Sequence, residues 1–281
     1  MDVLIEKGES STKLSSLGLL VLDFQDTSPT IELNKRTVTG RNGSVYAGAR
    51  FTEKTIKVSG RLLTQSNYHF EETKDVINAL LSDVEPFYIT KMYPEENFLY
   101  EFERPGEKLS DFDLFDIPHI PYKYRYKVTI NGSINYSFLG KSTAGLLFNF
   151  NVSFTTAEMP FGQTVPVDKV ITKNFIEYKG SAMCSQLEYP WYLKLTSNQE
   201  QTGSFTVKIG DRTFLYTASA KIKEGDILLL KGVENTLNGV NVNNHTNYEH
   251  FELLPSEENR NAFSTTFIGT VQLINFTEFY K

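Results

Sequence analysis

The sequence contains one cysteine, Cys184, so no disulfide bond can form within the chain. It has no block of like charges, because 28 Lys and Arg residues are interspersed with 34 Asp and Glu residues, and the formal net charge is -6. A mildly acidic protein repels phosphate, which makes nucleic acid a poor main partner. The longest apolar run, residues 17–22, is too short to cross a bilayer, and the first residues lack the pattern of a signal peptide. We therefore expect a chain that is made in a cytoplasm and does not insert into a membrane.

Motifs that carry chemistry are also scarce. His245 and His250 are five residues apart, which matches neither a helical zinc pair nor a zinc finger. The sequence has no Gly-x-Ser-x-Gly elbow and no glycine-rich phosphate loop. The acidic cluster of Asp111, Asp113 and Asp116 leaves calcium as a minor alternative, although it lacks the glycine and the distal glutamate of an EF-hand. We therefore expect no enzyme activity, no cofactor and no metal.

Alternating apolar and polar residues dominate the first half of the chain, as in antiparallel strands with one buried face. The alternating segments are residues 30–39, 51–63, 122–130 and 146–155. Asn42-Gly43 lies between the first two and favours the positive φ angles of a tight hairpin turn. We interpret the aromatic residues of the last two segments, residues 122–130 and 146–155, as sheet core and cross-strand pairs. The pattern predicts a mainly β fold.

One segment has a different period. Between Ser66 and Val84, apolar residues recur at helical spacing, Ser66 can cap the first turn, and Pro86 can end the helix. This spacing predicts a single amphipathic helix of about four turns. Residues 92–121 contain several Asp and Pro residues and one Gly, so we expect a projecting loop or arm there.

A boundary lies at residues 157–166, where two prolines and a glycine interrupt the strand pattern. Strand candidates then continue at residues 191–196, 204–209, 212–217, 226–231 and 267–276. Short strands at this spacing are typical of a β-sandwich or barrel. We therefore predict two domains, residues 1–162 and 163–281. Trp191 and Tyr192 could stack on a sugar if exposed, but a tryptophan at a strand start more often lies in a core.

The order of the elements resembles a known family. Its features here are Ser28-Pro29, Arg41-Asn42-Gly43-Ser44, the strand at residues 48–60, the single helix, Phe87-Tyr88-Ile89, the exit at residues 154–162 and a turn at residues 251–259. Together they resemble the siphophage tail-component family, the distal tail proteins. Two departures are Ser256, where the family usually has a glycine, and the length of residues 92–121.

The resemblance implies a structural role in a virion. In this family an N-terminal β-sandwich with one helix assembles head to tail into a hexameric ring. The ring joins the tail tube protein to the tail-tip protein, often a tail-associated lysin, and leaves a channel for DNA. A C-terminal galectin-like β-sandwich holds receptor-binding proteins or, in some relatives, contacts saccharide. We expect ring contacts from residues 51–63 and 92–121, and the candidates are Phe51, Ile56, Val58, Phe112 and Phe115.

Two other functions stay open at this point. A carbohydrate-binding module for host cell-wall saccharide predicts an exposed aromatic platform that includes Trp191, with Tyr192 beside it. A glycosidase on a β-sandwich predicts two carboxylates that converge in a cleft. A structure can test both alternatives, because the first requires exposed aromatic side chains and the second requires two carboxylates close together in a cleft.

Overall fold

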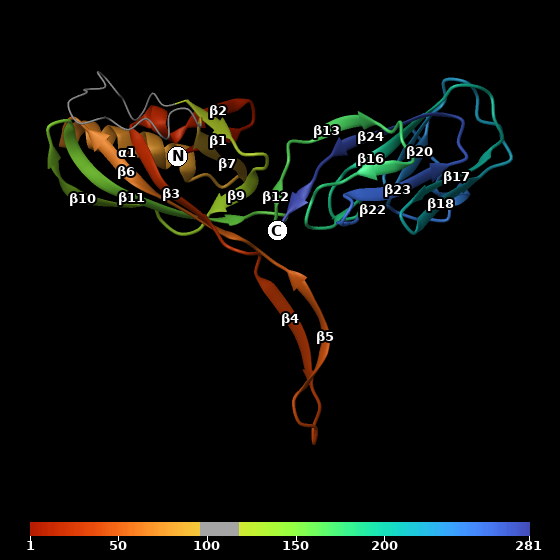
Figure 1. The fold of residues 1–281 in the computed structure, drawn as a ribbon, viewed down its shortest axis with the longest axis horizontal. Coiled ribbons are helices and arrows are strands. Elements are labelled where there is room, and N and C mark those ends of the chain that lie inside the picture. The colour runs from red at the N-terminus through yellow and green to blue at the C-terminus, as the bar shows by residue number, and fades with distance from the viewer. Residues whose placement is uncertain (96–117) are drawn as a thin grey trace. The chain divides into compact units, whose positions relative to one another are not determined.

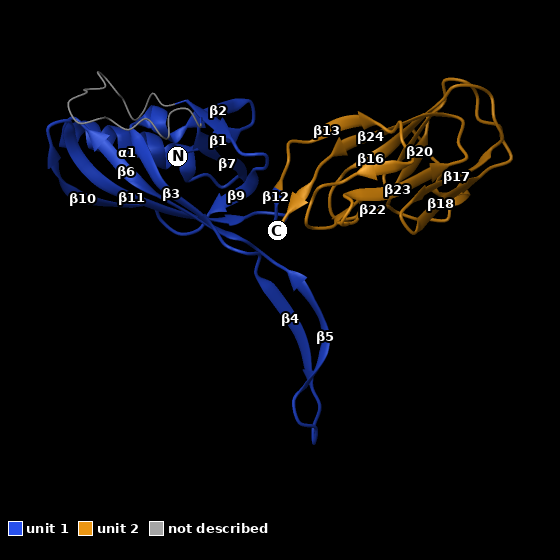
Figure 2. Cartoon of the chain, viewed as in Figure 1, with its two compact units in different colours: residues 1–162, 281 blue, residues 163–280 orange. Residues whose placement is uncertain are grey.

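The computed structural model describes residues 1–95 and 118–281. Contacts between residues divide the chain into two compact units (Figure 2), residues 1–162 with Lys281 and residues 163–280. Unit 1 contains α1, the one α-helix of the described residues, and both units are otherwise built from strands (Figure 1). The prediction of a mainly β fold with a single helix is therefore confirmed.

Unit 1 is organised around a nine-stranded antiparallel sheet in the order β2-β1-β7-β9-β11-β6-β3, with β10 paired to β11 and β8 paired to β7. Its strands are β1 (Asp2–Lys7), β2 (Ser10–Lys13), β3 (Leu19–Asp26), β6 (Thr55–Thr64), β7 (Phe87–Pro94), β8 (His119–Pro121), β9 (Tyr126–Ile130), β10 (Asn135–Ser142) and β11 (Gly145–Thr156). A 3-10 turn, η1 (Leu14–Leu17), precedes β3. Alternate residues of β6 and β11 are buried, as the alternation in the sequence predicts.

The sheet bends so that β7 and β9 lie over the strand β3 at one edge of the sheet. Tyr126 of β9 stacks on Phe24 of β3 with ring centroids 6.4 Å apart, although two other strands separate β9 from β3 in the hydrogen-bonded order. Lys91 of β7 reaches the same strand, because its Nζ donates to the carbonyl oxygen of Phe24 at 3.3 Å. The bent sheet therefore forms two layers around one core.

The helix α1 (Asn67–Leu81) packs against β6 and β11. Ser66 caps it, since its Oγ accepts a hydrogen bond from a backbone N–H of the first turn at 3.2 Å. Phe70 stacks on Phe148 of β11 with ring centroids 3.8 Å apart. The predicted helix and its cap are confirmed, but the helix ends before Val84, which is 92% exposed and belongs to the loop that follows.

A two-stranded hairpin, β4 (Ile31–Thr37) and β5 (Ser44–Phe51), lies outside the nine-stranded sheet. The chain leaves β3 to form it and returns into β6, and the hairpin extends away from these two strands (Figure 1). A hairpin connection is present around Asn42-Gly43, but the prediction of a tight turn there is wrong, because residues 38–43 form the connection and only Gly43 of the pair has a positive φ, 76°. The prediction of one continuous strand over residues 51–63 is wrong, because β5 ends at Phe51 and residues 52–54 join it to β6.

Unit 2 is also antiparallel and has a six-stranded sheet in the order β13-β24-β16-β19-β20-β21 and a four-stranded sheet in the order β14-β23-β17-β18. The first contains β13 (Val167–Val170), β16 (Tyr192–Ser197), β19 (Ile227–Leu230), β20 (Asn235–Leu237), β21 (Val240–Asn241) and β24 (Gly269–Phe276). The second contains β14 (Phe175–Glu177), β17 (Ser204–Ile209), β18 (Arg212–Thr217) and β23 (Arg260–Thr265). The short strands β12 (Gly162–Gln163) and β25 (Phe279–Tyr280) pair with each other, as do β15 (Cys184–Ser185) and β22 (Glu252–Leu253), and a 3-10 turn, η2 (Asn243–His245), follows β21. In residues 1–95 and 118–281, no helix is long and apolar enough to pass through a bilayer.

Candidate functional site

The hairpin has one apolar and one charged face. Cross-strand partners share a face of a two-stranded sheet, and the register pairs Ile31 with Phe51 and Leu33 with Ala49. The register pairs Glu32 with Arg50 on the opposite face, where the carboxylate of Glu32 accepts a hydrogen bond from Nε of Arg50 at 2.6 Å. The two strands therefore form an amphipathic ribbon.

A β-bulge extends the apolar face toward the turn. The register shifts after Leu33, so that two residues of β5, Ala47 and Gly48, lie opposite one residue of β4. Gly48 has a φ of 120°, a conformation that glycine adopts without strain. Beyond the bulge, Tyr46 pairs with Lys35 and adds an aromatic ring to the same face as Leu33. The bulge thus keeps the apolar side chains on one side of the ribbon.

The apolar hairpin face, defined as Ile31, Leu33, Tyr46, Ala49 and Phe51, is exposed. Ile31, Leu33 and Tyr46 are 55%, 50% and 64% exposed, respectively. Phe51, at the base of the hairpin, contacts the ring of Phe161 edge-on, with centroids 5.6 Å apart. A two-stranded hairpin is at best marginally stable alone, and an exposed apolar cluster of this kind marks an interaction surface. This face is therefore our candidate functional site.

Three polar side chains lie where the hairpin joins unit 1, and we call them the root network: Asp26, Lys54 and Tyr126. Lys54 is 2% exposed, and its Nζ lies 3.2 Å from Oδ2 of Asp26. The same Nζ donates to the hydroxyl oxygen of Tyr126 at 3.2 Å, and this hydroxyl donates to Oδ2 of Asp26 at 2.6 Å. The network therefore links the end of β3, the start of β6 and the strand β9 of the opposite layer.

The contacts within the root network favour the ionised form of Asp26 and the protonated form of Tyr126. Burial raises the pKa of Asp26, but the hydrogen bond from Tyr126 and the charge of Lys54 outweigh this effect, so the net pKa is below the usual value. Burial, followed by the hydrogen bond to Asp26, raises the pKa of Tyr126 well above its usual range. Tyr126 is therefore a protonated donor, and Asp26 is an ionised acceptor at neutral pH.

Acid should weaken the root network. Because the pKa of Asp26 is lower in the folded than in the unfolded chain, its carboxylate adds stability that is complete above the unfolded-state pKa of about 3.9 and is lost as the pH falls through the lower folded-state pKa. We expect Asp26→Asn to melt at a lower temperature than the wild type at neutral pH, with a gap that narrows below about pH 4. Thermal unfolding followed by circular dichroism across pH measures this gap. Asp23→Asn, on the same strand, should keep the acid dependence of the wild type, whereas a constant gap for Asp26→Asn would contradict the assignment.

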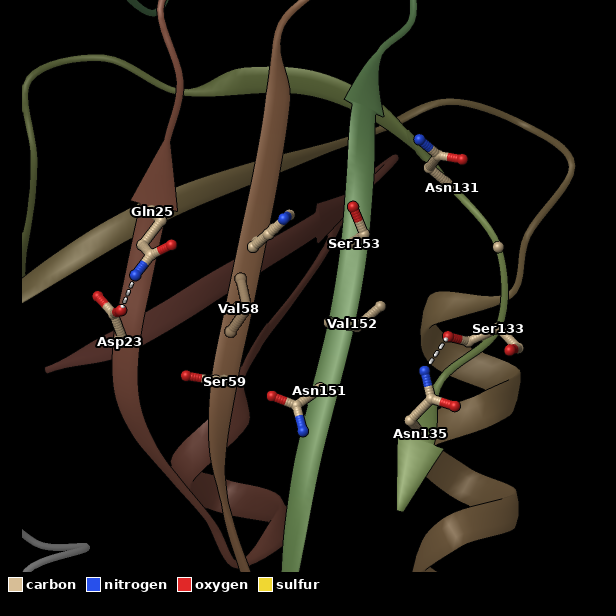
Figure 3. Close-up of a pocket in the computed structure, with 12 residues that line it drawn as sticks. Asp23, Gln25, Val58, Ser59, Asn131, Ser133, Asn135, Asn151, Val152 and Ser153 are labelled. Carbon is tan, nitrogen blue, oxygen red and sulfur yellow. Dashed lines mark hydrogen bonds between the residues drawn. The ribbon is translucent and has the colours of Figure 1, made fainter. Parts of the chain in front are cut away.

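A second feature of unit 1 is a polar depression of about 510 Å³ on the outer face of β3, β6 and β11 (Figure 3). Its lining consists of Asp23, Gln25, Lys57, Val58, Ser59, Asn131, Gly132, Ser133, Asn135, Asn151, Val152 and Ser153. Asp23 is the one carboxylate among these residues, and none of them is aromatic. The depression therefore offers neither a pair of acids nor a stacking platform for a sugar ring.

Each of four cavities lined by described residues holds a single carboxylate. These carboxylates are Asp23, Glu177, Glu72 and Asp26. A glycosidase needs two carboxylates on opposite sides of the scissile bond. None of these four cavities therefore provides the site that the glycosidase alternative requires.

The ring-contact candidates have different outcomes. Phe51 is partly exposed at the base of the apolar hairpin face. Ile56 and Val58 are fully buried in the core of unit 1, and their prediction as interface residues is wrong, because they point to the inner side of β6. Phe112 and Phe115 lie outside the described residues, as does the acidic cluster of residues 111–116.

The sugar-contact candidates do not form an aromatic platform. Trp191 is 1% exposed in the core of unit 2, so the hypothesis that it stacks on a saccharide is wrong for this conformation. Tyr192, the following residue and the first of β16, is half-buried, and the ammonium group of Lys231 lies 5.9 Å from its ring centroid. Along β16, which begins at Tyr192, every second residue is buried, and Tyr192 lies on the less buried face of the strand.

Sequence reasoning missed most of the apolar hairpin face. The alternation of Ile31 and Leu33 predicts half-buried sheet, and the projecting arm predicted from the sequence is residues 92–121, most of which lie outside the described residues. The available signal was Ser28-Pro29, which interrupts the strand pattern just before this alternation begins. The root network had no local signal, because its members are distant in the sequence.

Comparisons with known proteins agree with this architecture. The family described as the phage tail protein RIFT-related domain matches residues 10–155. No curated protein matches the chain. The crystal structure of Dit from phage SPP1, described as a paradigm of the hub adsorption apparatus in phages that infect Gram-positive bacteria, is 12% identical, with a TM-score of 0.64 over 99% of each chain.

Two structures of the phage p2 baseplate in its activated conformation, with Sr and with Ca, also match. They are 12% and 10% identical, with TM-scores of 0.37 and 0.36 over 99% of this chain and 96% of theirs. The likeness to SPP1 Dit shows a shared fold, and the family match covers more than half of the sequence. The chain therefore belongs to the family of phage tail proteins that contain the RIFT-related domain.

Proposed function

We propose that this phage tail protein is the hub of a tail tip, a structural protein that forms a hexameric ring at the distal end of the tail. The observation that carries the proposal is the apolar hairpin face, which is exposed on a unit whose own core is complete. A folded chain that exposes such a face has an unfilled interaction surface. The fold shared with SPP1 Dit, itself described as a hub protein, supports the same function.

The hairpin can build a ring if each copy inserts its apolar face against the next copy. The donor is a two-stranded ribbon and the receiving surface is a different part of the neighbour, so the contact is heterologous. Heterologous contacts close into a ring when the rotation between neighbours is a fixed fraction of a full turn. In this arrangement the hairpin buries Leu33 and Tyr46 at the subunit contact and leaves the Glu32–Arg50 ion pair at its rim.

In the virion, the ring joins the tail tube protein to the tail-tip protein and leaves a channel for DNA. The net charge of -6 on each copy favours this passage, because an acidic surface does not retain the phosphate backbone. Unit 2 then serves as the attachment point for receptor-binding proteins, in the role of the galectin-like domain of the distal tail proteins. The carbohydrate-binding alternative is weaker, since Trp191 is buried.

The mass of the protein in solution tests the proposal. We expect multi-angle light scattering across a concentration series to give the mass of six copies, or of two stacked rings, and negative-stain images to show a central hole. Mixing with the tail tube protein provides a second condition, because the proposed ring has the tube as its partner. A protein that stays monomeric in both conditions would overturn the hub proposal.

A further inference from the structure

The root network lies where the two strands of the hairpin leave the sheet. Asp26 is the last residue of β3, and Lys54 immediately precedes β6. Between these residues and the hairpin, the two chain segments are joined by backbone hydrogen bonds, including Thr30 N to Glu53 O at 2.7 Å. A change in the direction of the hairpin relative to the nine-stranded sheet can therefore occur at this root or in the short segment of residues 27–30 beside it.

Of the other contacts at the root, the pair Thr27 and Thr55 is directional, since the N–H of Thr27 donates to the carbonyl oxygen of Thr55 at 3.0 Å and the N–H of Thr55 donates to Oγ1 of Thr27 at 3.2 Å. The contacts beyond this pair constrain the direction less. Pro29 has no backbone N–H, so the ladder of hydrogen bonds is interrupted within residues 27–30. The contact of Phe51 with Phe161 is apolar, and apolar contacts are nearly independent of direction. The hydrogen bonds of Lys54 and Tyr126, in contrast, require defined angles between donor and acceptor.

A buried charge such as Lys54 is a poor means of adding stability, because desolvation cancels much of the attraction to its partner. The backbone of Lys54 is held as well, since its N–H donates to Oγ1 of Thr156 at 3.0 Å and its carbonyl oxygen accepts from the backbone N–H of Thr156 at 3.0 Å. The side chain and the main chain of one residue thus connect β6 to β9, β11 and the end of β3. This arrangement favours a role in geometry over a role in stability.

We propose that Asp26, Lys54 and Tyr126 are positioning residues that fix the direction in which the hairpin leaves unit 1. The consequence for assembly depends on the proposed ring, in which every copy must repeat the same rotation. If the direction of the hairpin varies from copy to copy, the deviations add up around the ring and the last copy does not meet the first. Closure of the ring therefore requires a hairpin whose direction is already fixed in the free chain. The network supplies this orientation before any neighbour binds.

Distance measurements between two spin labels test this proposal in the single chain. One label is placed at Arg41→Cys in the hairpin turn and the other at Val76→Cys on the exposed side of α1, and both sites lie in unit 1. Cys184, the only native cysteine, is buried, and Cys184→Ala provides a background without other thiols. Dilution with unlabelled protein restricts the signal to distances within one copy.

Two variants test whether the hairpin loses its fixed direction in a chain that still folds. Lys54→Met removes a buried charge without leaving another one buried, and Tyr126→Phe removes only a hydroxyl, so both chains should fold. We expect one narrow distance peak for the parent and loss of this peak into a broad distribution for both variants. Lys57→Met, on the neighbouring strand β6 but facing the polar depression, is the matched control and should keep the narrow peak.

The outcomes distinguish this proposal from the ring itself. A narrow peak in both Lys54→Met and Tyr126→Phe, with unchanged position, would overturn the positioning role whatever the state of assembly. Broad peaks in a chain whose parent never forms a ring would uphold the positioning role and count against the hub. If both variants melt at a lower temperature but keep the distance peak of the parent, the network only stabilises the fold. This outcome would also overturn the proposal.

Discussion

Leu33→Glu should abolish ring formation and leave the folded monomer intact. Leu33 is half exposed in the free chain, where a glutamate would remain hydrated at little cost. In the ring the same side chain would be buried, so the variant loses the burial of a leucine and must also desolvate a charge. Together these effects cost about 3 kcal/mol or more at each contact, which weakens each contact by about a hundredfold. The mass by light scattering should fall to that of the monomer, with an unchanged melting temperature.

Asn34→Glu is the matched control for this prediction. It adds the same charge to the same strand, on the face that carries Glu32 and Arg50. We expect this variant to assemble like the wild type, apart from a modest dependence on salt. If Leu33→Glu also forms rings, the apolar hairpin face is not the subunit contact. If both variants fail to assemble, added charge alone explains the effect.

Strands with strict alternation between clear turns could be predicted from the sequence in detail. Residues 204–209 and 212–217 were predicted as strands, and β17 and β18 have these bounds. Gly210-Asp211 separates them, and Gly210 adopts a φ of 57°, so the turn marks both ends of the hairpin. The helix was predictable for a similar reason, because Ser66 caps a segment whose apolar residues follow the helical period.

The apolar hairpin face could not be predicted because alternation reports that one face is apolar but not what covers it. Ile31 and Leu33 give the same pattern whether their partner belongs to the same chain or to another copy. The break between β5 and β6 does leave a trace in the sequence, because Phe51 is out of phase with the alternation of Ile56 and Val58, and the phase changes within residues 52–55. For the root network, Asp26 and Tyr126 are one hundred residues apart, so only the bent sheet brings them together.

Trp191→Ala should be among the most destabilising substitutions in unit 2. The side chain is fully buried, and its removal leaves a cavity that the two sheets cannot close without moving strands. Replacing a buried tryptophan by alanine costs about 3–5 kcal/mol. Among the described residues, the indole Nε1 has no hydrogen-bond partner, so Trp191→Phe avoids burying an unpaired N–H and should cost less. Differential scanning calorimetry should show an earlier transition for unit 2 and an unchanged one for unit 1.

Tyr192→Ala is the control for Trp191→Ala. It tests whether the loss of stability comes from the core position of Trp191 or from truncating any aromatic side chain in this part of the chain. Tyr192 follows Trp191 as the first residue of β16 and is only half-buried, so its truncation should cost clearly less than that of Trp191. The pair also separates the two interpretations of these aromatic residues. A platform for cell-wall saccharide would give a small loss of stability for Trp191→Ala together with a loss of saccharide binding in isothermal titration calorimetry. A core residue gives the reverse, because the cavity destabilises unit 2 whether or not a sugar is present.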